Sequence, residues 1–284
     1  MSQTIDDTTG GEADQARPAG GRSARDGADS APGTGPAEKY GDALADVYDL
    51  MYPWAEGPVI AQRLAGLVPP GSRALELGIG TGRVAIPAAR AGLRVHGVEG
   101  SAKMLDILAR NDREGSITTT HGDFTDTVVE SGAFDLVYVV CNTLFMLTSA
   151  DAQIAALTVG RRQLAPGGIL VVEAYDPSPF HTLERPIVQA RHLAADTLMI
   201  DTVSCDPVEQ SVVEIHTLIR PGTVDTFVEV SNYRWPRELD ALARLAGLRL
   251  VTREGGWQGE PFVQGSPRHV SIYRAAEEPA PGAP

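Results

Sequence analysis

The sequence ALELGIGTGR, residues 74–83, joins a short apolar run to three closely spaced glycines. Residues 74–77 predict a buried strand, the glycines predict a tight turn, and the residues that follow predict a helix that reaches Ala91 and ends at Gly92. Glycine permits positive φ angles and a close approach of the backbone to a ligand, and the first turn of a helix has free N–H groups. The stretch therefore predicts a binding site for an adenosine-containing cofactor.

The spacing of the glycines discriminates between cofactors. A dinucleotide-binding loop of the form G-x-G-x-x-G would need a small residue at position 83, where Arg83 stands. Arg83 therefore disfavours a nicotinamide-dependent oxidoreductase, which is kept as the alternative. The pattern in this chain is instead Glu76-x-Gly78-x-Gly80-x-Gly82.

The segments on both sides of this loop alternate between strand-like and helix-like patterns. Further strands are expected at residues 94–98, 117–121, 134–141, 169–174, 248–253 and 269–273, and helices at residues 102–110, 148–164 and 236–246. The run FDLVYVVC at residues 134–141 is almost continuously apolar, as in a parallel sheet that is covered on both faces. This order predicts an α/β fold with a doubly wound, mostly parallel, seven-stranded Rossmann-like sheet.

The alternation breaks after Tyr175. Three stretches rich in Val, Ile and Thr, separated by turn sequences, predict an antiparallel β insertion after the fifth strand; they are residues 197–203, 208–219 and 225–233. Few large apolar residues occur at the two ends of the chain, so burial there cannot offset the cost of ordering. The expected organisation is a disordered tail at 1–38, an N-terminal helical cap at 39–70, a core at 71–176 and 234–276, the insertion as a substrate lid at 177–233, and a second disordered tail at 277–284.

Acidic residues stand at the ends of three successive expected strands: Glu76, Glu99 and Asp123. A carboxylate at the end of the second strand can accept hydrogen bonds from both ribose hydroxyls of an adenosine. With the glycine spacing and Gly122-Asp123-Phe124, these residues resemble the class I S-adenosylmethionine-dependent methyltransferases over residues 40–275. The resemblance implies that S-adenosylmethionine is the cofactor, that Asp123 accepts from the adenine amino group and that Phe124 packs against the ring.

The segment Tyr48-Asp49-Leu50-Met51-Tyr52 resembles the one with which small-molecule methyltransferases close an N-terminal helix over the cofactor. A stripe of core aromatic residues on one helix face is the alternative. The complete set of expected cofactor-binding residues is Tyr40, Tyr48, Tyr52, Glu76, Gly78, Gly80, Gly82, Arg83, Glu99, Met104, Asp123, Phe124, Cys141 and Asn142.

The acceptor of the methyl group is less well defined by the sequence. The insertion resembles the substrate-covering sheet of aminosugar N,N-dimethyltransferases, but Met146 stands where the compared enzymes have a histidine. Asn142 is not followed by the Pro-Pro-aromatic run of nucleic-acid amino-methyltransferases. Residues 256–262 and 268–270 are more similar to a broad actinobacterial set of small-molecule methyltransferases. A small secondary metabolite is therefore expected, and a catalytically silent methyltransferase-like scaffold is the remaining alternative.

Transfer to an amine and transfer to a hydroxyl are both left open. A neutral amine needs only its lone pair aimed at the methyl group, whereas a hydroxyl needs a general base. His181 and His216 are the candidate catalytic bases, with a solvated loop histidine and a cross-strand pair as their structural alternatives. An aromatic pocket suits a medium-sized natural product. The residues expected to bind the substrate are Trp54, Phe145, Tyr175, Phe180, Tyr233 and Trp235.

The composition of the chain disfavours several classes of binding partner. The chain has 24 Lys and Arg against 37 Asp and Glu, a net charge of −13, which disfavours general binding to nucleic acid or to anionic membranes. Its two cysteines, Cys141 and Cys205, form no metal-binding or disulfide pattern. We therefore expect no bound metal and a location in the reducing cytoplasm. The N-terminus lacks the basic and apolar regions of a signal peptide. A homodimer is left open.

Overall fold

The computed structural model describes residues 36–52, 54–129 and 133–276, with side chains from Gly41 onward. Most of the first expected tail and all of the second lie outside these residues. Helix α1 (Pro36–Met51) begins inside the range 1–38 that the sequence assigns to the tail.

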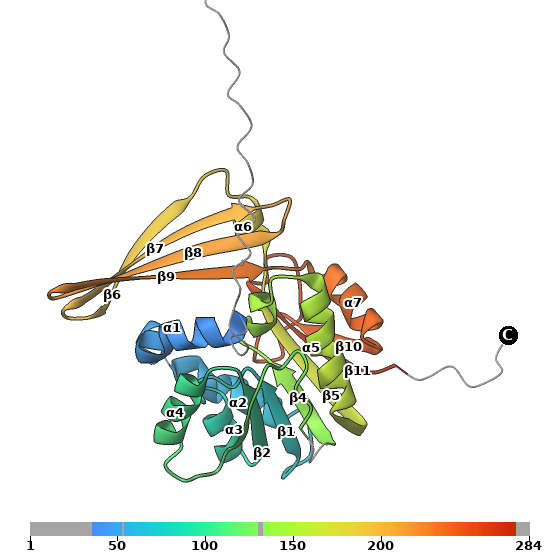
Figure 1. The fold of residues 1–284 in the computed structure, drawn as a ribbon. Coiled ribbons are helices and arrows are strands. Elements are labelled where there is room, and N and C mark those ends of the chain that lie inside the picture. Colours follow the sequence, from blue (N-terminus) through green and yellow to red (C-terminus); the bar gives the residue numbers. More distant parts are fainter. Residues whose placement is uncertain (1–35, 53, 130–132, 277–284) are drawn as a thin grey trace, which may run out of the picture. The chain divides into compact units, whose positions relative to one another are not determined.

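The core is a seven-stranded sheet in the order β10-β11-β5-β4-β1-β2-β3 (Figure 1). Its strands are β1 (Arg73–Leu77), β2 (Arg94–Glu99), β3 (Thr118–His121), β4 (Phe134–Val139), β5 (Leu164–Tyr175), β10 (Leu248–Glu254) and β11 (Arg268–Ala275). Strands β1 to β5 pair in parallel, and β11 runs antiparallel to both β5 and β10. The expectation of a doubly wound, mostly parallel Rossmann-like sheet is confirmed.

Helices cover both faces of this sheet. They are α2 (Gly57–Ala65), α3 (Ala85–Arg90), α4 (Ala102–Asn111), α5 (Ala150–Arg162) and α7 (Pro236–Leu245). The remaining short helices are α6 (Ser178–His181), which follows β5 and contacts the insertion, and the 3-10 helices η1 (Trp54–Glu56) and η2 (Thr143–Met146). Ala74 of β1 packs in one core with α2 and α3, whereas Leu75 and Leu77 pack in another with α5 and α7. Burial on both faces explains why these strands are almost continuously apolar.

Several element boundaries differ from the sequence expectation, those of β4, β5 and α3 among them. Strand β4 ends two residues early because Cys141 and Asn142 adopt left-handed φ angles of 58° and 62°. Strand β5 begins at Leu164, five residues before the expected range of 169–174, and runs through Pro166-Gly167-Gly168. Helix α3 begins at Ala85 rather than directly after the glycines.

The insertion is a separate antiparallel sheet of four strands, in the order β6-β7-β8-β9. They are β6 (Ile187–Ala194), β7 (Thr197–Asp206), β8 (Ser211–Arg220) and β9 (Thr223–Asn232). The sequence pattern predicted the last three of these strands. It missed β6, because this edge strand is largely exposed and carries polar residues in place of a clear apolar alternation.

The four-stranded sheet packs on the core through one of its faces. Met199 and Leu218 of this sheet share a buried cluster with Leu44 and Met51 of α1. Figure 1 shows the sheet lying above α1, at the end of the core where β4 and β5 finish. The insertion therefore covers the carboxyl ends of the parallel strands, where α/β folds bind ligands.

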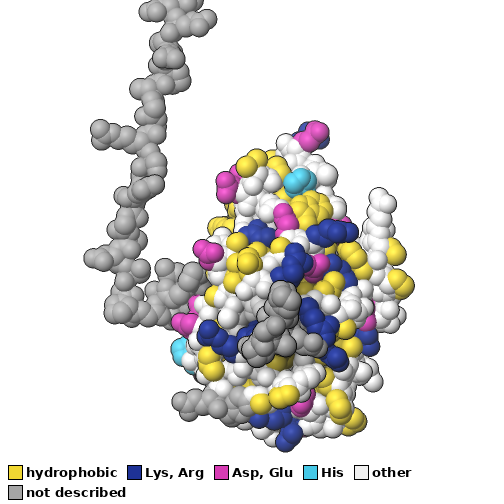
Figure 2. Space-filling view, turned by 90° about the vertical axis from the view of Figure 1, so that its right-hand side faces the viewer, with side chains coloured by type: hydrophobic (Ala, Val, Ile, Leu, Met, Phe, Trp, Pro, Cys, Tyr) yellow, Lys and Arg dark blue, Asp and Glu magenta, His cyan; other side chains and the backbone are white. Residues whose placement is uncertain are grey.

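No helix within the described residues is long and apolar enough to cross a membrane. On the face shown in Figure 2, Lys and Arg side chains occur in small groups among hydrophobic and acidic ones.

Candidate functional site

The glycine loop after β1 has the conformation that its sequence predicts. Gly78, Gly80 and Gly82 have φ angles of 76°, 55° and 87°. A Cβ atom on Gly78 would lie 2.6 Å from the Cγ2 atom of Thr143. Glycine is therefore required at position 78 both for the backbone angle and for the close approach of η2.

Glu99 ends β2 beneath this loop and is 8% exposed. Its Oε2 atom accepts a hydrogen bond from the Gly80 amide at 2.9 Å, and its Oε1 atom accepts one from the Ser101 amide at 2.9 Å. Burial raises the pKa of Glu99, while these backbone hydrogen bonds oppose the rise. The carboxylate thus braces the loop and retains lone pairs for a ligand hydroxyl.

Glu76 lies on the other side of the loop and is 4% exposed. The Tyr138 hydroxyl donates to its Oε2 atom at 3.0 Å. Burial raises the pKa of Glu76 to about 8, although the Tyr138 hydrogen bond and the positive charge of Arg83 act in the opposite direction. A carboxyl group in this state is sensitive to any positive charge that a ligand brings beside it.

Helix α1 is fixed on the glycine loop by a residue that the sequence reasoning did not single out. The Thr81 hydroxyl donates to Asp49 Oδ1 at 2.6 Å, and Asn111 of α4 donates to Asp49 Oδ2 at 3.2 Å. These bonds place the neighbouring Tyr48 and Tyr52 over the loop, with their ring centroids 5.0 Å apart. Tyr48 lines the hollow at the glycine loop, and both tyrosines also pack against a buried cluster that joins α1 to the insertion. Tyr40 lies in α1 before the residues whose side chains are described.

Arg83 joins the loop to this aromatic cover. Its guanidinium carbon lies 5.9 Å from the ring centroid of Tyr48 and 5.8 Å from that of Tyr52. Burial acts to lower the pKa of Arg83, but negative groups that include Glu76 and Glu173 raise it overall. Arg83, which in the sequence disfavours a dinucleotide-binding loop, thus forms part of the wall of the site.

Three connected hollows run along the carboxyl ends of the strands. The smallest, about 20 Å³, lies at the glycine loop beside Glu76. The second, about 220 Å³, is the inner cavity; its lining residues are Tyr48, Tyr52, Glu56, Ile60, Arg83, Cys141, Asn142, Met146, Glu173, Glu229 and Arg268. The third, about 610 Å³, includes Asp123 and Phe124 in its lining and shares Met146 with the inner cavity.

Known proteins share this sequence and this architecture. A family model described as a methyltransferase domain matches residues 74–168. The cypemycin N-terminal methyltransferase of a Streptomyces species is 30% identical over 194 residues, which cover 68% of this chain and 79% of that relative. This chain belongs to the class I S-adenosylmethionine-dependent methyltransferases.

Solved methyltransferase structures have the same fold. The CcbJ methyltransferase from Streptomyces caelestis matches with a TM-score of 0.79 and 33% identity, covering 86% of this chain and 100% of CcbJ. DesVI from Streptomyces venezuelae matches with a TM-score of 0.63 and 25% identity, covering 82% and 98% of the two chains.

The methyltransferase uses S-adenosylmethionine, and its residues fit this cofactor. The buried Glu99 carboxylate suits ribose hydroxyls, and the half-buried Asp123 with the buried Phe124 suits an adenine. In the protein alone, Asp123 Oδ1 accepts from the Thr125 amide at 2.8 Å. Met104, also expected at the cofactor, packs instead in the buried cluster between α4, α1 and the insertion.

Three carboxylates line the inner cavity of the methyltransferase: those of Glu56, Glu173 and Glu229. Glu173 at the end of β5 is 4% exposed and accepts from the Asn142 amide at 3.2 Å. Glu229 on β9 accepts from the Tyr52 hydroxyl at 3.2 Å. From its place at the end of the fifth expected strand, the sequence allows Glu173 either to bind an amine or to cap the following loop. The sequence reasoning did not identify Glu229, although its position on the inward-facing side of an alternating strand is a signal.

His216 lies at the centre of a charged network on the inner face of the insertion. Its Nδ1 atom is 2.7 Å from Asp201 Oδ1, and its Nε2 atom is 3.8 Å from Glu229 and 4.0 Å from Glu214. Burial acts to lower the pKa of His216, but the carboxylates of Glu229 and Asp201 raise it to about 9. Arg191 on β6 pairs with Asp201 at 3.3 Å, so the network crosses all four strands.

The other expected substrate residues meet one another rather than the inner cavity. The side chains of Phe145, Tyr175, Phe180, Tyr233 and Trp235 belong to one packed cluster beneath the insertion. His181 joins this cluster, with its Nδ1 atom 2.6 Å from the Tyr233 hydroxyl. Trp54 is half-buried in η1. Neither His181 nor Trp54 is among the residues that line the inner cavity.

Proposed function

We propose that this methyltransferase transfers the methyl group to an amine nitrogen of a small natural product. The observation that carries the proposal is the lining of the inner cavity, which contains three carboxylates and two tyrosines: Glu56, Glu173, Glu229, Tyr48 and Tyr52. Carboxylates and aromatic faces both attract an ammonium group. The inner cavity adjoins the small hollow at the glycine loop, because Tyr48, Arg83 and Cys141 line both.

When bound, S-adenosylmethionine supplies a methyl group on a sulfonium, which an amine lone pair takes in line as the carbon–sulfur bond breaks. An ammonium has no lone pair, so the acceptor must lose one proton before the new bond forms. In our proposal Glu229 holds the ammonium on arrival and Tyr52 orients the Glu229 carboxylate. Glu173 presents a second carboxylate from the opposite wall and can take the proton.

The surroundings of His216 support an amine over a hydroxyl. Neither His216 nor His181, the candidate bases for a hydroxyl acceptor, is among the described residues that line the inner cavity. With a pKa of about 9, His216 carries a proton near neutral pH and has no lone pair to offer. We infer that it positions Glu229. The printed name of the cypemycin relative, an N-terminal methyltransferase, agrees with transfer to nitrogen.

The experiment compares Glu229→Gln with Glu209→Gln, a change in the exposed turn between β7 and β8 of the same sheet. A panel of amino-acid amides, short peptides and aminosugars serves as acceptor. Loss of a charged hydrogen-bond partner costs about 1.5–3 kcal/mol, so Glu229→Gln should raise KM for the amine by roughly 10- to 150-fold. Glu209→Gln should match the wild type. An unchanged KM in Glu229→Gln, or methyl transfer to oxygen, would contradict the proposal.

A further inference from the structure

The inner cavity is too small for a complete natural product. Its volume is about 220 Å³, whereas pockets that enclose a drug-sized ligand measure roughly 300–1,000 Å³. The 610 Å³ hollow contains Asp123 and Phe124, which the family resemblance assigns to the adenine. An acceptor larger than its own amine end therefore has to extend in another direction.

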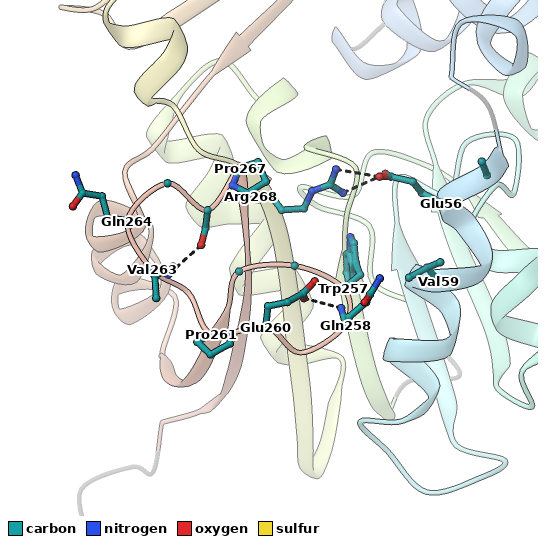
Figure 3. Close-up of a pocket in the computed structure, with 15 residues that line it drawn as sticks. Glu56, Val59, Trp257, Gln258, Glu260, Pro261, Val263, Gln264, Pro267 and Arg268 are labelled. Atoms are coloured by element: carbon teal, nitrogen blue, oxygen red, sulfur yellow. Dashed lines mark hydrogen bonds and ion pairs between the residues drawn. The ribbon is translucent and has the colours of Figure 1, made fainter.

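A surface groove adjoins the inner cavity and shares no lining residue with the 610 Å³ hollow. It measures about 580 Å³ and lies between helix α2 with η1 and the loop of residues 255–268 (Figure 3). Glu56 and Arg268 line both the groove and the inner cavity. The two spaces thus meet at one pair of side chains.

This pair is an ion pair that side-chain rotation alone can open. Arg268 donates to the two carboxylate oxygens of Glu56 at 3.2 Å each, and it lies 3.7 Å from the buried Glu173. The Glu56 side chain is 62% exposed, so it can turn from Arg268 toward solvent. Arg268 keeps the buried Glu173 as a partner when Glu56 moves away, which offsets part of the cost of opening the pair.

The loop that forms the far wall is internally braced. The Gly255 amide donates to the Glu260 carbonyl at 2.7 Å, and the Gln258 amide donates to the Glu260 carboxylate at 2.9 Å. The Val263 amide donates to the Ser266 hydroxyl at 3.0 Å. The groove is therefore a preformed surface rather than a gap between unconnected side chains.

Its lining suits a chain that alternates amide and apolar groups. Gln258 and Gln264 present exposed primary amides, which both donate and accept. The apolar part of the lining is Val59, Pro261, Val263 and Pro267. Trp257 also belongs to the lining, although most of its side chain is packed in the core of the domain.

We propose that the groove binds the body of a peptide-like acceptor whose terminal amine enters the inner cavity past Glu56 and Arg268. This inference rests on the proposed function, because it takes the methylated atom to be an amine. A compact aminosugar would occupy the inner cavity alone and leave the groove unused. The groove thus makes the length of the acceptor a determinant of specificity.

The test uses two libraries with every N-terminal residue, one of amino-acid amides and one of hexapeptide amides, with labelled S-adenosylmethionine. Val59→Trp fills the groove, and Val251→Trp on β10 is the matched control, because these valines are 43% and 46% exposed. We expect the wild type and Val251→Trp to favour hexapeptides by about tenfold or more in kcat/KM, and Val59→Trp to lose this preference. Val263→Trp, at a residue 60% exposed on the opposite wall, repeats the test if Val59→Trp does not fold.

The outcomes separate the two proposals. Equal methylation of both libraries, unaffected by a tryptophan in the groove, would overturn the proposal that the groove binds the acceptor. It would leave the proposed transfer to an amine intact. Preferred methylation of free aminosugars would do the same. No transfer to any amine by a protein that still binds S-adenosylhomocysteine would overturn the amine function, and the groove proposal with it.

Discussion

Replacing Glu99 probes how the glycine loop holds the cofactor. The carboxylate accepts from the Gly80 and Ser101 amides at 2.9 Å each, and the family resemblance adds the two ribose hydroxyls as ligands. Hydrogen bonds to a charged group contribute about 1.5–3 kcal/mol, so losing the ribose contact should weaken cofactor binding by roughly 10- to 100-fold. Glu99→Gln keeps one acceptor oxygen for the loop. Glu99→Ala leaves both buried amides without a partner, at about 1–3 kcal/mol each.

Calorimetry with S-adenosylhomocysteine measures the affinity, and thermal unfolding measures the stability of each variant. Glu99→Gln should lose affinity with a smaller fall in Tm than Glu99→Ala, because it leaves one of the two amides without an acceptor rather than both. Glu209→Gln, on the insertion, is the control and should behave as the wild type. An affinity of Glu99→Gln within about threefold of the wild type would refute the reasoning, because it is less than the weakest charged hydrogen bond.

Three further outcomes are expected. We propose that the α-ammonium of S-adenosylhomocysteine binds beside Glu76, whose pKa burial raises to about 8, so binding should expel the Glu76 proton; the binding enthalpy near pH 7 should then vary with the buffer's ionisation enthalpy in the wild type and not in Glu76→Gln, and a buffer-independent enthalpy in the wild type would contradict this placement. The carboxylates of Glu229 and Asp201 raise the pKa of His216 from 6.5 to about 9, so the stability that the charged His216 adds to the fold is complete below about pH 6.5 and is lost as the pH rises through 9. The Tm of the wild type should fall over that range, and His216→Asn should flatten this fall; an equal fall in both proteins would contradict the pairing of His216 with the carboxylates. Gly78→Ala places a Cβ atom 2.6 Å from Thr143 Cγ2 and should weaken cofactor binding, part of which Thr143→Ser should recover; full affinity in Gly78→Ala would show that the loop is not constrained.

Local sequence patterns were sufficient for the core. The strand, glycine loop and helix around residues 74–91 are set by apolar runs and by backbone angles that only glycine adopts easily. The parallel register follows from the βαβ order, which brings Glu99 and the loop after β3 to one edge of the sheet. Glu76, Glu99 and the three glycines could therefore be placed before the structure was known.

The wall of the inner cavity could not be predicted in the same way. Its members come from α1, η1, β5, β9 and β11, and Tyr52 and Glu229 are 177 residues apart in the chain. Nothing in a local pattern encodes how the four-stranded sheet docks on α1. The role of Asp49 was hidden for the same reason, since its partners Thr81 and Asn111 lie on other elements.

The aromatic residues show the limit of composition as a guide. Phe145, Tyr175, Phe180 and Tyr233 were expected to bind substrate because large aromatic side chains line many ligand pockets. In the structure they pack against one another beneath the insertion. Aromatic side chains also bury a large apolar area, so core packing and ligand binding select the same residues. Only the tertiary arrangement separates these two uses.

The position of the transferred methyl group is the most direct test of the account. The protein is incubated with S-adenosylmethionine carrying a ¹³C-labelled methyl group and an extract of Streptomyces metabolites, and carbon–proton NMR identifies the atom to which the label is bonded. Our account predicts a labelled N-methyl signal on a small molecule, at least about tenfold weaker with Glu229→Gln and unchanged with Glu209→Gln. A labelled O-methyl signal, or label found only in protein or nucleic acid, would contradict it.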